Sequence, residues 1–398
     1  MSSVMNAIPH EASHMPYGIP LLPQGLWLLH QKHGLTMWSE LLDPAIKLAN
    51  TGYMVDSVLA SAIETNREKV QSSLGLSSLY FFANGTMKSR ENKILNPQLG
   101  KVLLQIANQM SDALLPADLI QNFSSDIDSS QSPTFNQMLY KKYLNIESPV
   151  TIHLPGMTML TPPAPSAGQI LSDLIWEMNS QKPLENTSKD HSINRAYSVL
   201  LNASKMTYAS HGFKPSNSSH QASTSWDPAP AGANVLIANS HGDIFVMSIS
   251  LNSSFGSGFV SPSTGILMND FIHGPESPSA STPIFWASPT VVIIAGTDND
   301  IVGLVASGAS SLPFALGQVI LNHVYLMNDL TVSVSGPLVD LTSGSSDPWL
   351  EYLGIWGKKP DSERRPEDYS CSTVAVGVEA EHVHVAKSPG LCCYYRGI

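Results

Sequence analysis

The sequence predicts a mixed α/β protein in which helices and strands occur in both halves of the chain. Segments with helical spacing alternate with short β-rich runs, and that alternation is typical of mixed α/β folds. With 398 residues, 42% of them hydrophobic and 13% charged, the chain has the composition of a globular protein with a large core. Two β-prone runs, 235–238 and 244–250, flank a cluster of Gly, Asn and Asp and therefore predict a hairpin.

The first half of the chain is predicted to be mostly helical, because its apolar residues recur with the spacing of amphipathic helices. Pro44 interrupts one pattern and is compatible with a first turn or a kink. The Asp- and Ser-rich stretch 124–133 indicates a surface loop, and the prolines of 162–165 indicate a rigid turn. The predicted helices cover 24–33, 37–50, 54–72, 96–110, 166–178 and 194–209, and a strand covers 150–153.

A stretch without apolar periodicity, 214–230, separates the two halves and has the Ser, Pro and Asn content of an exposed linker. Beyond the hairpin, the second half is predicted to contain more strands than helices. Its predicted elements are strands over 290–295 and 301–306 joined by a turn at 296–300, a helix over 312–327, and strands over 330–334, 373–378 and 382–385.

Composition and short motifs exclude several classes of function. The net charge is −11, from 21 Lys and Arg against 32 Asp and Glu, and no basic stripe is present, so nucleic acid is not an expected partner. Cys371, Cys392 and Cys393 have neither the number of a disulfide framework nor the spacing of a zinc site, and are interpreted as free or singly paired thiols. The sequence contains no phosphate-binding loop, dinucleotide fingerprint or G-x-S-x-G motif.

One cluster invites a metal-site interpretation: Glu379, Glu381, His382 and His384 lie close together in the sequence. Strand alternation places the two histidines on one face and the two glutamates on the other. A polar edge strand is therefore the preferred interpretation, and no metal is predicted.

An ordered string of residues surrounds the predicted hairpin. It consists of the Gly-Asp turn, Ser248-Ile249-Ser250-Leu251-Asn252, Phe255-Gly256-Ser257, Ser261-Pro262 and Gly265-Ile266-Leu267. Further stretches belong to the same pattern, at 30–34 with Trp38, 44–49, 96–99, 162–168, 381–385 and 392–393. This string resembles the start of the small subunit in the gamma-glutamyltransferase (glutathione hydrolase) family, and the resemblance extends from about Gly18 to the end of the chain.

The resemblance implies an N-terminal nucleophile hydrolase fold, an αββα four-layer sandwich, which we expect to be N-terminally truncated here. It divides the chain into a leader at 1–17, predicted to be disordered, a large-subunit-like helical region at 18–213, a Ser/Pro-rich linker at 214–231 and a small-subunit-like region at 232–398. The family reaction is the hydrolysis or transfer of the gamma-glutamyl group of glutathione and its conjugates, without a cofactor. In this family the precursor cuts itself before a threonine, whose hydroxyl then attacks while its own amine serves as the base.

The expected nucleophile position in this chain has no hydroxyl. Counting back without gaps from Phe255-Gly256 places it at Gly232, whose neighbours are Ala231 and Ala233. The nearest upstream hydroxyls, Thr224 and Ser225, fall in the predicted linker, where a nucleophile would lack the precise positioning it needs. The sequence therefore predicts a single uncleaved chain with weak or no activity.

The other site positions are partly kept. The resemblance implies that Ser250 positions the nucleophile, that Asn252 and Asp270 bind the substrate, and that the backbone of Gly308 and Ala309 forms the oxyanion hole. Each side chain also has an ordinary structural interpretation, as a cross-strand partner for Ser250, a turn former for Asn252 and a cap for Asp270. Phe285-Trp286 replaces the serine pair that grips the substrate carboxylate, and the arginine that pairs with this carboxylate is expected upstream of Met1.

Six Asn-x-Ser/Thr sequons suggest a glycoprotein of the secretory pathway. The candidates are Asn84, Asn122, Asn186, Asn202 and Asn217, together with Asn252. The first 18 residues lack the basic and apolar regions of a signal peptide, and no run approaches the roughly 20 apolar residues that span a bilayer. By resemblance we expect a location at the cell surface, with a membrane anchor that would precede this chain.

Three hypotheses follow for the function. The chain could be an enzyme that transfers or hydrolyses gamma-glutamyl groups, with glutathione or other gamma-glutamyl compounds as partners. It could be a pseudoenzyme of the same fold that binds a ligand or a protein without cutting it. It could also be a truncated product that folds poorly. The absence of a hydroxyl at Gly232 favours the second or the third.

Overall fold

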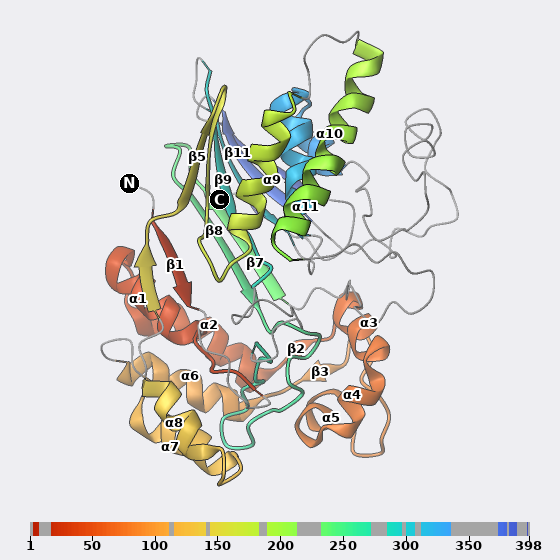
Figure 1. The fold of residues 1–398 in the computed structure, drawn as a ribbon. Helices are drawn as coiled ribbons and strands as arrows, with labels where there is room; N and C mark the ends of the chain where they lie inside the picture. The colour runs from red at the N-terminus through yellow and green to blue at the C-terminus, as the bar shows by residue number, and fades with distance from the viewer. Residues whose placement is uncertain are drawn as a thin grey trace.

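A six-stranded antiparallel sheet forms the centre of the molecule (Figure 1). The computed structural model describes residues 3–7, 17–110, 115–140, 144–182, 189–212, 232–271, 285–296, 300–306, 312–335, 373–379, 382–387 and 396. The strand order is β12-β11-β10-β9-β6-β5, with every neighbouring pair antiparallel. The strands are β5 Val150–Leu154, β6 Met157–Thr161, β9 Thr290–Ile294, β10 Ile301–Ala306, β11 Thr373–Glu379 and β12 His382–Lys387.

The predicted hairpin forms a second β layer. It consists of β7 Gly232–Ala238 and β8 Ile244–Ser250, closed by a turn in which Gly242 has a φ of +83°. A Cβ built on Gly303 of β10 would lie 2.8 Å from Ile244 and 2.9 Å from Val246, so the hairpin packs tightly on that face of the large sheet. Val302, the neighbour of Gly303 in β10, points to the opposite face of the large sheet, because side chains alternate along a strand.

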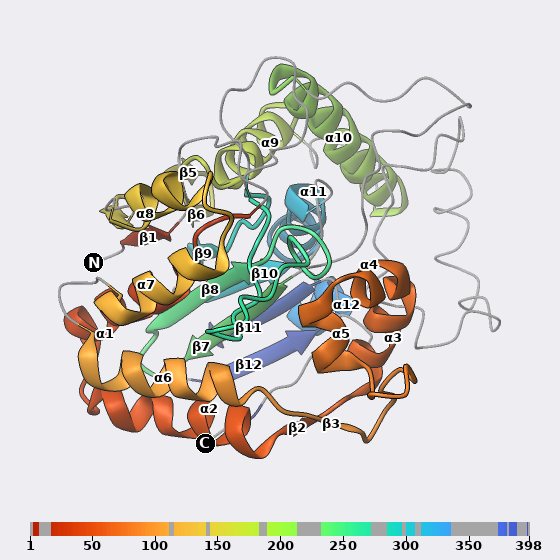
Figure 2. The same cartoon turned by 90° about the horizontal axis from the view of Figure 1, so that it is seen from below.

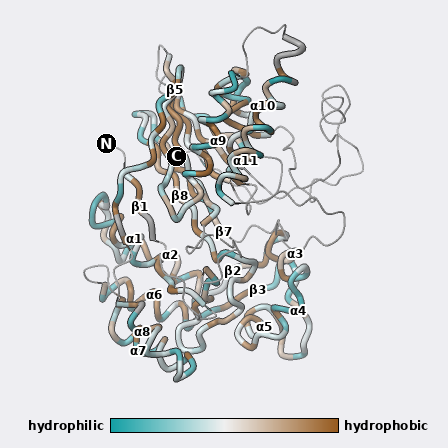
Figure 3. The backbone as a smooth tube through the Cα atoms, viewed as in Figure 1, coloured by the Kyte–Doolittle hydropathy of each residue, from teal (hydrophilic) through white to brown (hydrophobic). Residues whose placement is uncertain are grey.

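Helices cover the other face of the large sheet, where α9, α10 and α11 lie together beside the strands in Figure 1. The main core lies between these helices and the sheet, and hydrophobic segments run along the strands in Figure 3. Fully buried side chains such as Leu174, Leu200 and Leu316 fill it. The helices of this layer are α9 Gly168–Ser180, α10 Lys189–Ser210, α11 Leu312–Ile320, the π-helix η1 Leu321–Tyr325 and α12 Leu330–Ser335.

The remaining helices form two smaller clusters, separate from this layer in Figures 1 and 2. They are α1 Leu22–His33, α2 Trp38–Thr51, α3 Ser57–Thr65, α4 Arg67–Ser72, α5 Leu74–Tyr80, α6 Pro97–Gln109, α7 Ala117–Asp126 and α8 Ser132–Tyr140. Two short sheets accompany them, β1 Val4–Ala7 with β4 Leu144–Glu147 and β2 Tyr53–Met54 with β3 Lys93–Ile94.

The loop that follows the hairpin is held by both clusters. Phe255 and Val260 belong to the hydrophobic core of α3 to α5, and Met268 belongs to the core of α6 to α8. The first half of the chain therefore fixes the segment that is predicted to carry the active site.

The structure confirms most of the predicted elements, and three predictions are wrong in whole or in part. The leader 1–17 was predicted to be disordered, but its residues Val4–Ala7 form β1, which pairs with β4. The predicted surface loop 124–133 overlaps the end of α7 and the start of α8. The segment 330–334 was predicted as a strand because of its β-branched residues, but it forms the helix α12. The Asp329 side chain accepts a hydrogen bond from the Thr331 N–H (2.7 Å), and Leu330 and Val334, four residues apart, are both buried. Capping and burial thus outweigh intrinsic propensity here. In addition, the predicted helix 54–72 is two helices, because Asn66 interrupts it.

Replacing Asp329 with alanine is expected to lower the free energy of unfolding by about 1 kcal/mol, the usual value of an N-terminal cap. The Thr331 N–H holds the pKa of the Asp329 carboxyl below its ordinary value of 3.8. A depressed native pKa means that this contribution is present above about pH 4 and is lost as the pH falls through the native value. Urea unfolding of the parent and of Asp329→Asn at pH 7 and pH 3 measures it, because asparagine caps without titrating. The variant should lose less stability than the parent between the two pH values.

Candidate active site

The predicted nucleophile position lies at the first residue of the hairpin. Gly232 opens β7 and is paired with Ser250 at the end of β8, so the residue expected to attack and the hydroxyl expected to position it are register partners. A Cβ built on Gly232 would lie 2.2 Å from the carbonyl oxygen of Ile249. Real Cβ atoms never approach a backbone oxygen so closely, so any larger residue here requires a shift of the strand.

Several predicted site residues fall outside the part of the chain that the structure describes. These are the upstream hydroxyls Thr224 and Ser225 and the oxyanion-hole positions Gly308 and Ala309. Their roles stay predictions. The same holds for the candidate glycosylation sites Asn186 and Asn217.

The structure brings Ser250, Asn252 and Asp270 together in one hydrogen-bonded network. The Ser250 hydroxyl accepts a hydrogen bond from the Asn252 N–H (2.9 Å), and the Asn252 side-chain amide donates to the Asp270 carbonyl (3.2 Å). The Asp270 N–H donates in turn to the carbonyl of Leu251 (3.1 Å). Asn252, with a φ of +76°, thus forms a turn, and the three residues share one small region beside the nucleophile position.

The carboxylate of Asp270 is held by Ser253, a residue that no pattern in the sequence indicates as part of the site. The Ser253 N–H donates to Oδ1 (3.0 Å), and the Ser253 hydroxyl donates to Oδ2. An ionised carboxylate offers about four acceptor positions, so two remain for a further donor. The arrangement fixes the direction of the carboxylate and leaves it able to bind a cation.

The backbone of this loop has an unusual conformation. Asn252, Phe255, Gly256 and Gly258 have φ values of +76°, +57°, +50° and +74°. For the two non-glycine residues this conformation is uncommon, and such strain concentrates at functional sites. Gly256 is required, because a Cβ there would lie 2.4 Å from the Met268 carbonyl oxygen.

An aromatic contact holds Phe255 in this strained position. Its ring packs edge-on against Tyr80 of α5, with 5.5 Å between the ring centroids. Burial raises the pKa of the Tyr80 hydroxyl, and the neighbouring Tyr53 raises it further, so Tyr80 remains neutral.

Two charged residues from distant helices form hydrogen bonds with the same loop, and no pattern in the sequence indicates either contact. Lys69 of α4 donates from Nζ to the carbonyls of Ser254 (2.7 Å) and Gly256 (2.6 Å). Asp126, at the end of α7, accepts from the hydroxyl of Ser261 (2.5 Å) and from the N–H (2.9 Å) and hydroxyl (2.6 Å) of Ser263.

Aromatic rings occupy the positions at which the resemblance implies a carboxylate clamp. The ring of Phe285 packs edge-on against Phe271, the neighbour of Asp270, with 5.2 Å between the centroids. Trp286 packs against the main core. Neither side chain of the Phe285-Trp286 pair can reproduce the hydrogen bonds of two serine hydroxyls.

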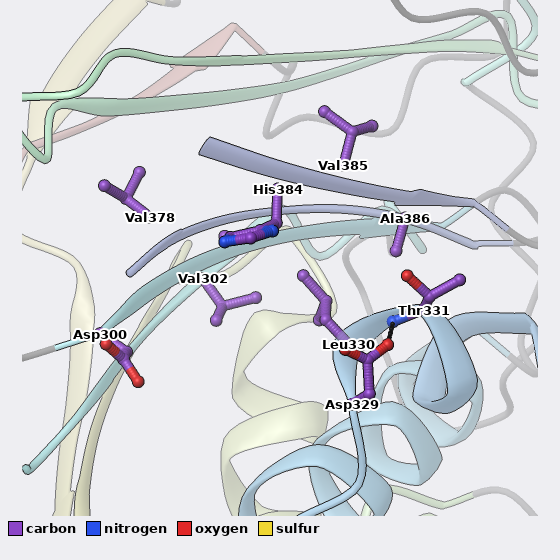
Figure 4. A pocket seen from close by; sticks show the side chains of 10 residues that line it. Asp300, Val302, Asp329, Leu330, Thr331, Val378, His384, Val385 and Ala386 are labelled. Carbon is purple, nitrogen blue, oxygen red and sulfur yellow. Dashed lines mark hydrogen bonds between the residues drawn. The ribbon is translucent and has the colours of Figure 1, made fainter. Parts of the chain in front are cut away.

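A small cavity of about 90 Å³ lies elsewhere in the molecule, between the sheet and α12 (Figure 4). It lies on the face of the large sheet opposite the hairpin. Gly377 is the register partner of Val302 and therefore faces the same way, and a Cβ built on Gly377 would lie 3.1 Å from Leu330 of α12. Its polar lining comes from Asp300, Asp329, Thr331 and His384. Within the described ranges, no three His, Cys, Asp or Glu side chains converge as ligands of a metal ion would.

Comparisons with known proteins agree with the fold and with the resemblance. The gamma-glutamyltranspeptidase family model matches residues 5–214, more than half of the 398 residues. Glutathione hydrolase 6 of Mus musculus is 27% identical over the whole chain, and that of Homo sapiens is 24% identical. Glutathione hydrolase 2 of Arabidopsis thaliana is 25% identical over 81% of the chain. The chain spans only 66% of the length of the mouse relative.

The crystal structure of a cephalosporin acylase from Bacillus halodurans aligns with a TM-score of 0.71 at 16% identity, covering 96% of this chain and 78% of that one. This likeness confirms the N-terminal nucleophile hydrolase fold, an α+β sandwich. Among the described residues, no helix combines the length and the apolar character needed to cross a bilayer. By the family match over more than half of its length and by relatives that align along its whole length, the chain belongs to the gamma-glutamyltranspeptidase family.

Proposed function

We propose that this chain is a non-catalytic member of its family, which binds gamma-glutamyl compounds without cleaving them. The observation that carries the proposal is Gly232: the position that opens the hairpin has no hydroxyl, and Ile249 leaves no room for one. A nucleophile must have both an attacking atom and a base within hydrogen-bond distance. The described hairpin supplies neither at this position.

Binding is supported by the residues around Asp270. A gamma-glutamyl compound carries an ammonium group, and a carboxylate with two unused acceptor positions is suited to it. Ser253 and Asn252 orient this carboxylate and its backbone. The substrate carboxylate would find aromatic rings in place of a hydrogen-bonding pair, so we infer weak affinity, with the ammonium as the recognised group.

The test of this proposal begins with the purified chain on a denaturing gel, where a single uncut band is expected. No anilide should be released from a gamma-glutamyl anilide. Calorimetry with glutathione should detect binding that Asp270→Asn weakens by roughly tenfold, the effect of one charge-assisted hydrogen bond. Asp43→Asn, a change on the exposed surface of α2, is the matched control and should leave the affinity unchanged. Two bands or steady anilide release would disprove the non-catalytic assignment.

A second candidate is the reaction named in the relatives, the hydrolysis of glutathione. It requires a hydroxyl from the segment 213–231, where Thr224 and Ser225 are the nearest candidates. Anilide release that disappears when both are replaced by alanine would establish it. A cooperative thermal transition of the purified chain would argue against the third hypothesis, a poorly folded fragment.

A further inference from the structure

A tight hairpin between α5 and β3 carries one of the six sequons. The N–H of Phe82 donates to the carbonyl of Thr86 (2.8 Å), and the N–H of Gly85 donates to the carbonyl of Phe82 (2.9 Å). A bridge between Phe81 and Met87 continues the antiparallel pairing below this turn. Gly85 has a φ of +79°, and no atom lies within 4 Å of where its Cβ would be. The turn therefore projects into solvent with a defined conformation.

Asn84 lies at the tip of this hairpin. Its Oδ1 accepts a hydrogen bond from the Thr86 N–H (3.0 Å), so the side chain has a fixed direction. Asn84, Gly85 and Thr86, the three residues of the sequon, are all exposed. N-glycosylation modifies Nδ2, so the hydrogen bond that Oδ1 accepts is compatible with the modified side chain.

An exposed aromatic ring accompanies the sequon. Phe82 lies two residues before Asn84, and it pairs with Thr86 across the hairpin. It is 44% exposed, although the Nζ of Lys88 lies 5.8 Å from its ring centroid. An exposed aromatic ring beside a fixed turn is the surface on which the apolar face of a sugar ring packs, because the C–H groups of the sugar meet the π-electrons.

We propose that Asn84 is a glycosylation site whose first N-acetylglucosamine packs on the ring of Phe82. In the transfer, Nδ2 of Asn84 forms a bond to C1 of the sugar and loses one proton. The bond from C1 to the lipid pyrophosphate of the oligosaccharide donor breaks, and the pyrophosphate leaves with the electron pair. The attached sugar then covers a ring that is otherwise exposed to water, so the modification stabilises the hairpin.

The other sequons in the described part of the chain lack these features. Ser124, the hydroxyl residue of the Asn122 sequon, donates to the Ile120 carbonyl within α7 (2.8 Å). Ser204, that of the Asn202 sequon, is 1% exposed within α10. The Asn252 side chain donates to Asp270 and belongs to the strained loop. Asn84 is therefore the position at which modification fits the native fold.

The experiment translates the full chain behind an appended secretion signal in the presence of microsomes, and keeps only protease-protected, translocated chains. Peptide mapping after glycosidase treatment in heavy-oxygen water should place the label at Asn84. Asn84→Gln and Thr86→Ala should both remove it. Asn202→Gln, the matched control at the exposed asparagine of a helical sequon whose Ser204 is buried, should leave it in place. An unmodified Asn84 in translocated chains would overturn the proposal.

The role of Phe82 is tested by hydrogen exchange on protein from a secreting eukaryotic host, trimmed to one sugar, against the same chain from bacteria. The amides of 82–88 should exchange roughly fivefold more slowly in the sugar-bearing protein, because local opening then costs more. In Phe82→Ala, the sugar should still attach, and the amides of 82–88 should exchange at the same rate with and without the sugar. An equal difference with and without Phe82 would refute the packing of the sugar on this ring.

Discussion

Gly232→Thr, the substitution that supplies the family's nucleophile, is expected to destabilise this chain by about 2–3 kcal/mol and to restore no self-cleavage. The Cβ of the new residue would lie 2.2 Å from the Ile249 carbonyl oxygen, and β7 would have to move away from β8 to relieve the overlap. That movement disturbs the pairing of Gly232 with Ser250. The geometry needed for attack is then lost together with the stability, because productive alignment tolerates only a fraction of an ångström.

Urea unfolding followed by circular dichroism measures the loss of stability, and a denaturing gel measures cleavage. Ala233→Thr is the matched control, because Ala233 is the exposed neighbour in the same strand and threonine favours strands. It should change the free energy of unfolding by less than about 0.5 kcal/mol. A Gly232→Thr chain that is as stable as the parent and cuts itself would show that the hairpin accepts a nucleophile, and would remove the main support for a non-catalytic function.

Local signals allowed most of the fold to be predicted. The hairpin was predicted because two β-rich runs flank a Gly-Asp turn, and the structure gives Gly242 the left-handed conformation of such a turn. The prediction of a strand at 330–334 was wrong for a reason that local propensity cannot reveal. Its β-branched residues favour a strand, whereas the cap at Asp329 and the burial of Leu330 and Val334 against the large sheet favour a helix.

Some residues of the candidate site could likewise be predicted from local signals in the sequence, and others could not. Ser250, Asn252 and Asp270 could be predicted because they belong to one ordered string of residues, and the structure places them in one network. Lys69 and Asp126 contact that segment from helices more than 100 residues away in the sequence. A lysine on an amphipathic helix is most often a solvated residue, so nothing in its neighbourhood indicated a contact with the loop.

Lys69 is therefore a site residue whose role is visible only in the structure. Its ammonium has three protons, and each has an acceptor: the carbonyls of Ser254 and Gly256, and the hydroxyl of Ser253 at 3.4 Å. Ser253 in turn holds the carboxylate of Asp270. The lysine thus donates hydrogen bonds to the carbonyls of a strained loop. It also orients Ser253, which in turn orients the carboxylate of Asp270, the proposed ligand-binding group.

Lys69→Met keeps the length and apolar character of the side-chain stem and removes only the charge and its hydrogen bonds. We expect a loss of about 2–3 kcal/mol in the free energy of unfolding, because hydrogen bonds from a charged donor are each worth about 1.5–3 kcal/mol and two partly buried carbonyls lose their partner. We also expect weaker binding of glutathione, since Asp270 loses its indirect support. Lys101→Met, on the exposed surface of α6, should change neither quantity. If Lys69→Met unfolded at the same urea concentration as the parent while binding was lost, the lysine would act on the ligand directly and the loop would be held by its buried aromatic residue, Phe255, instead.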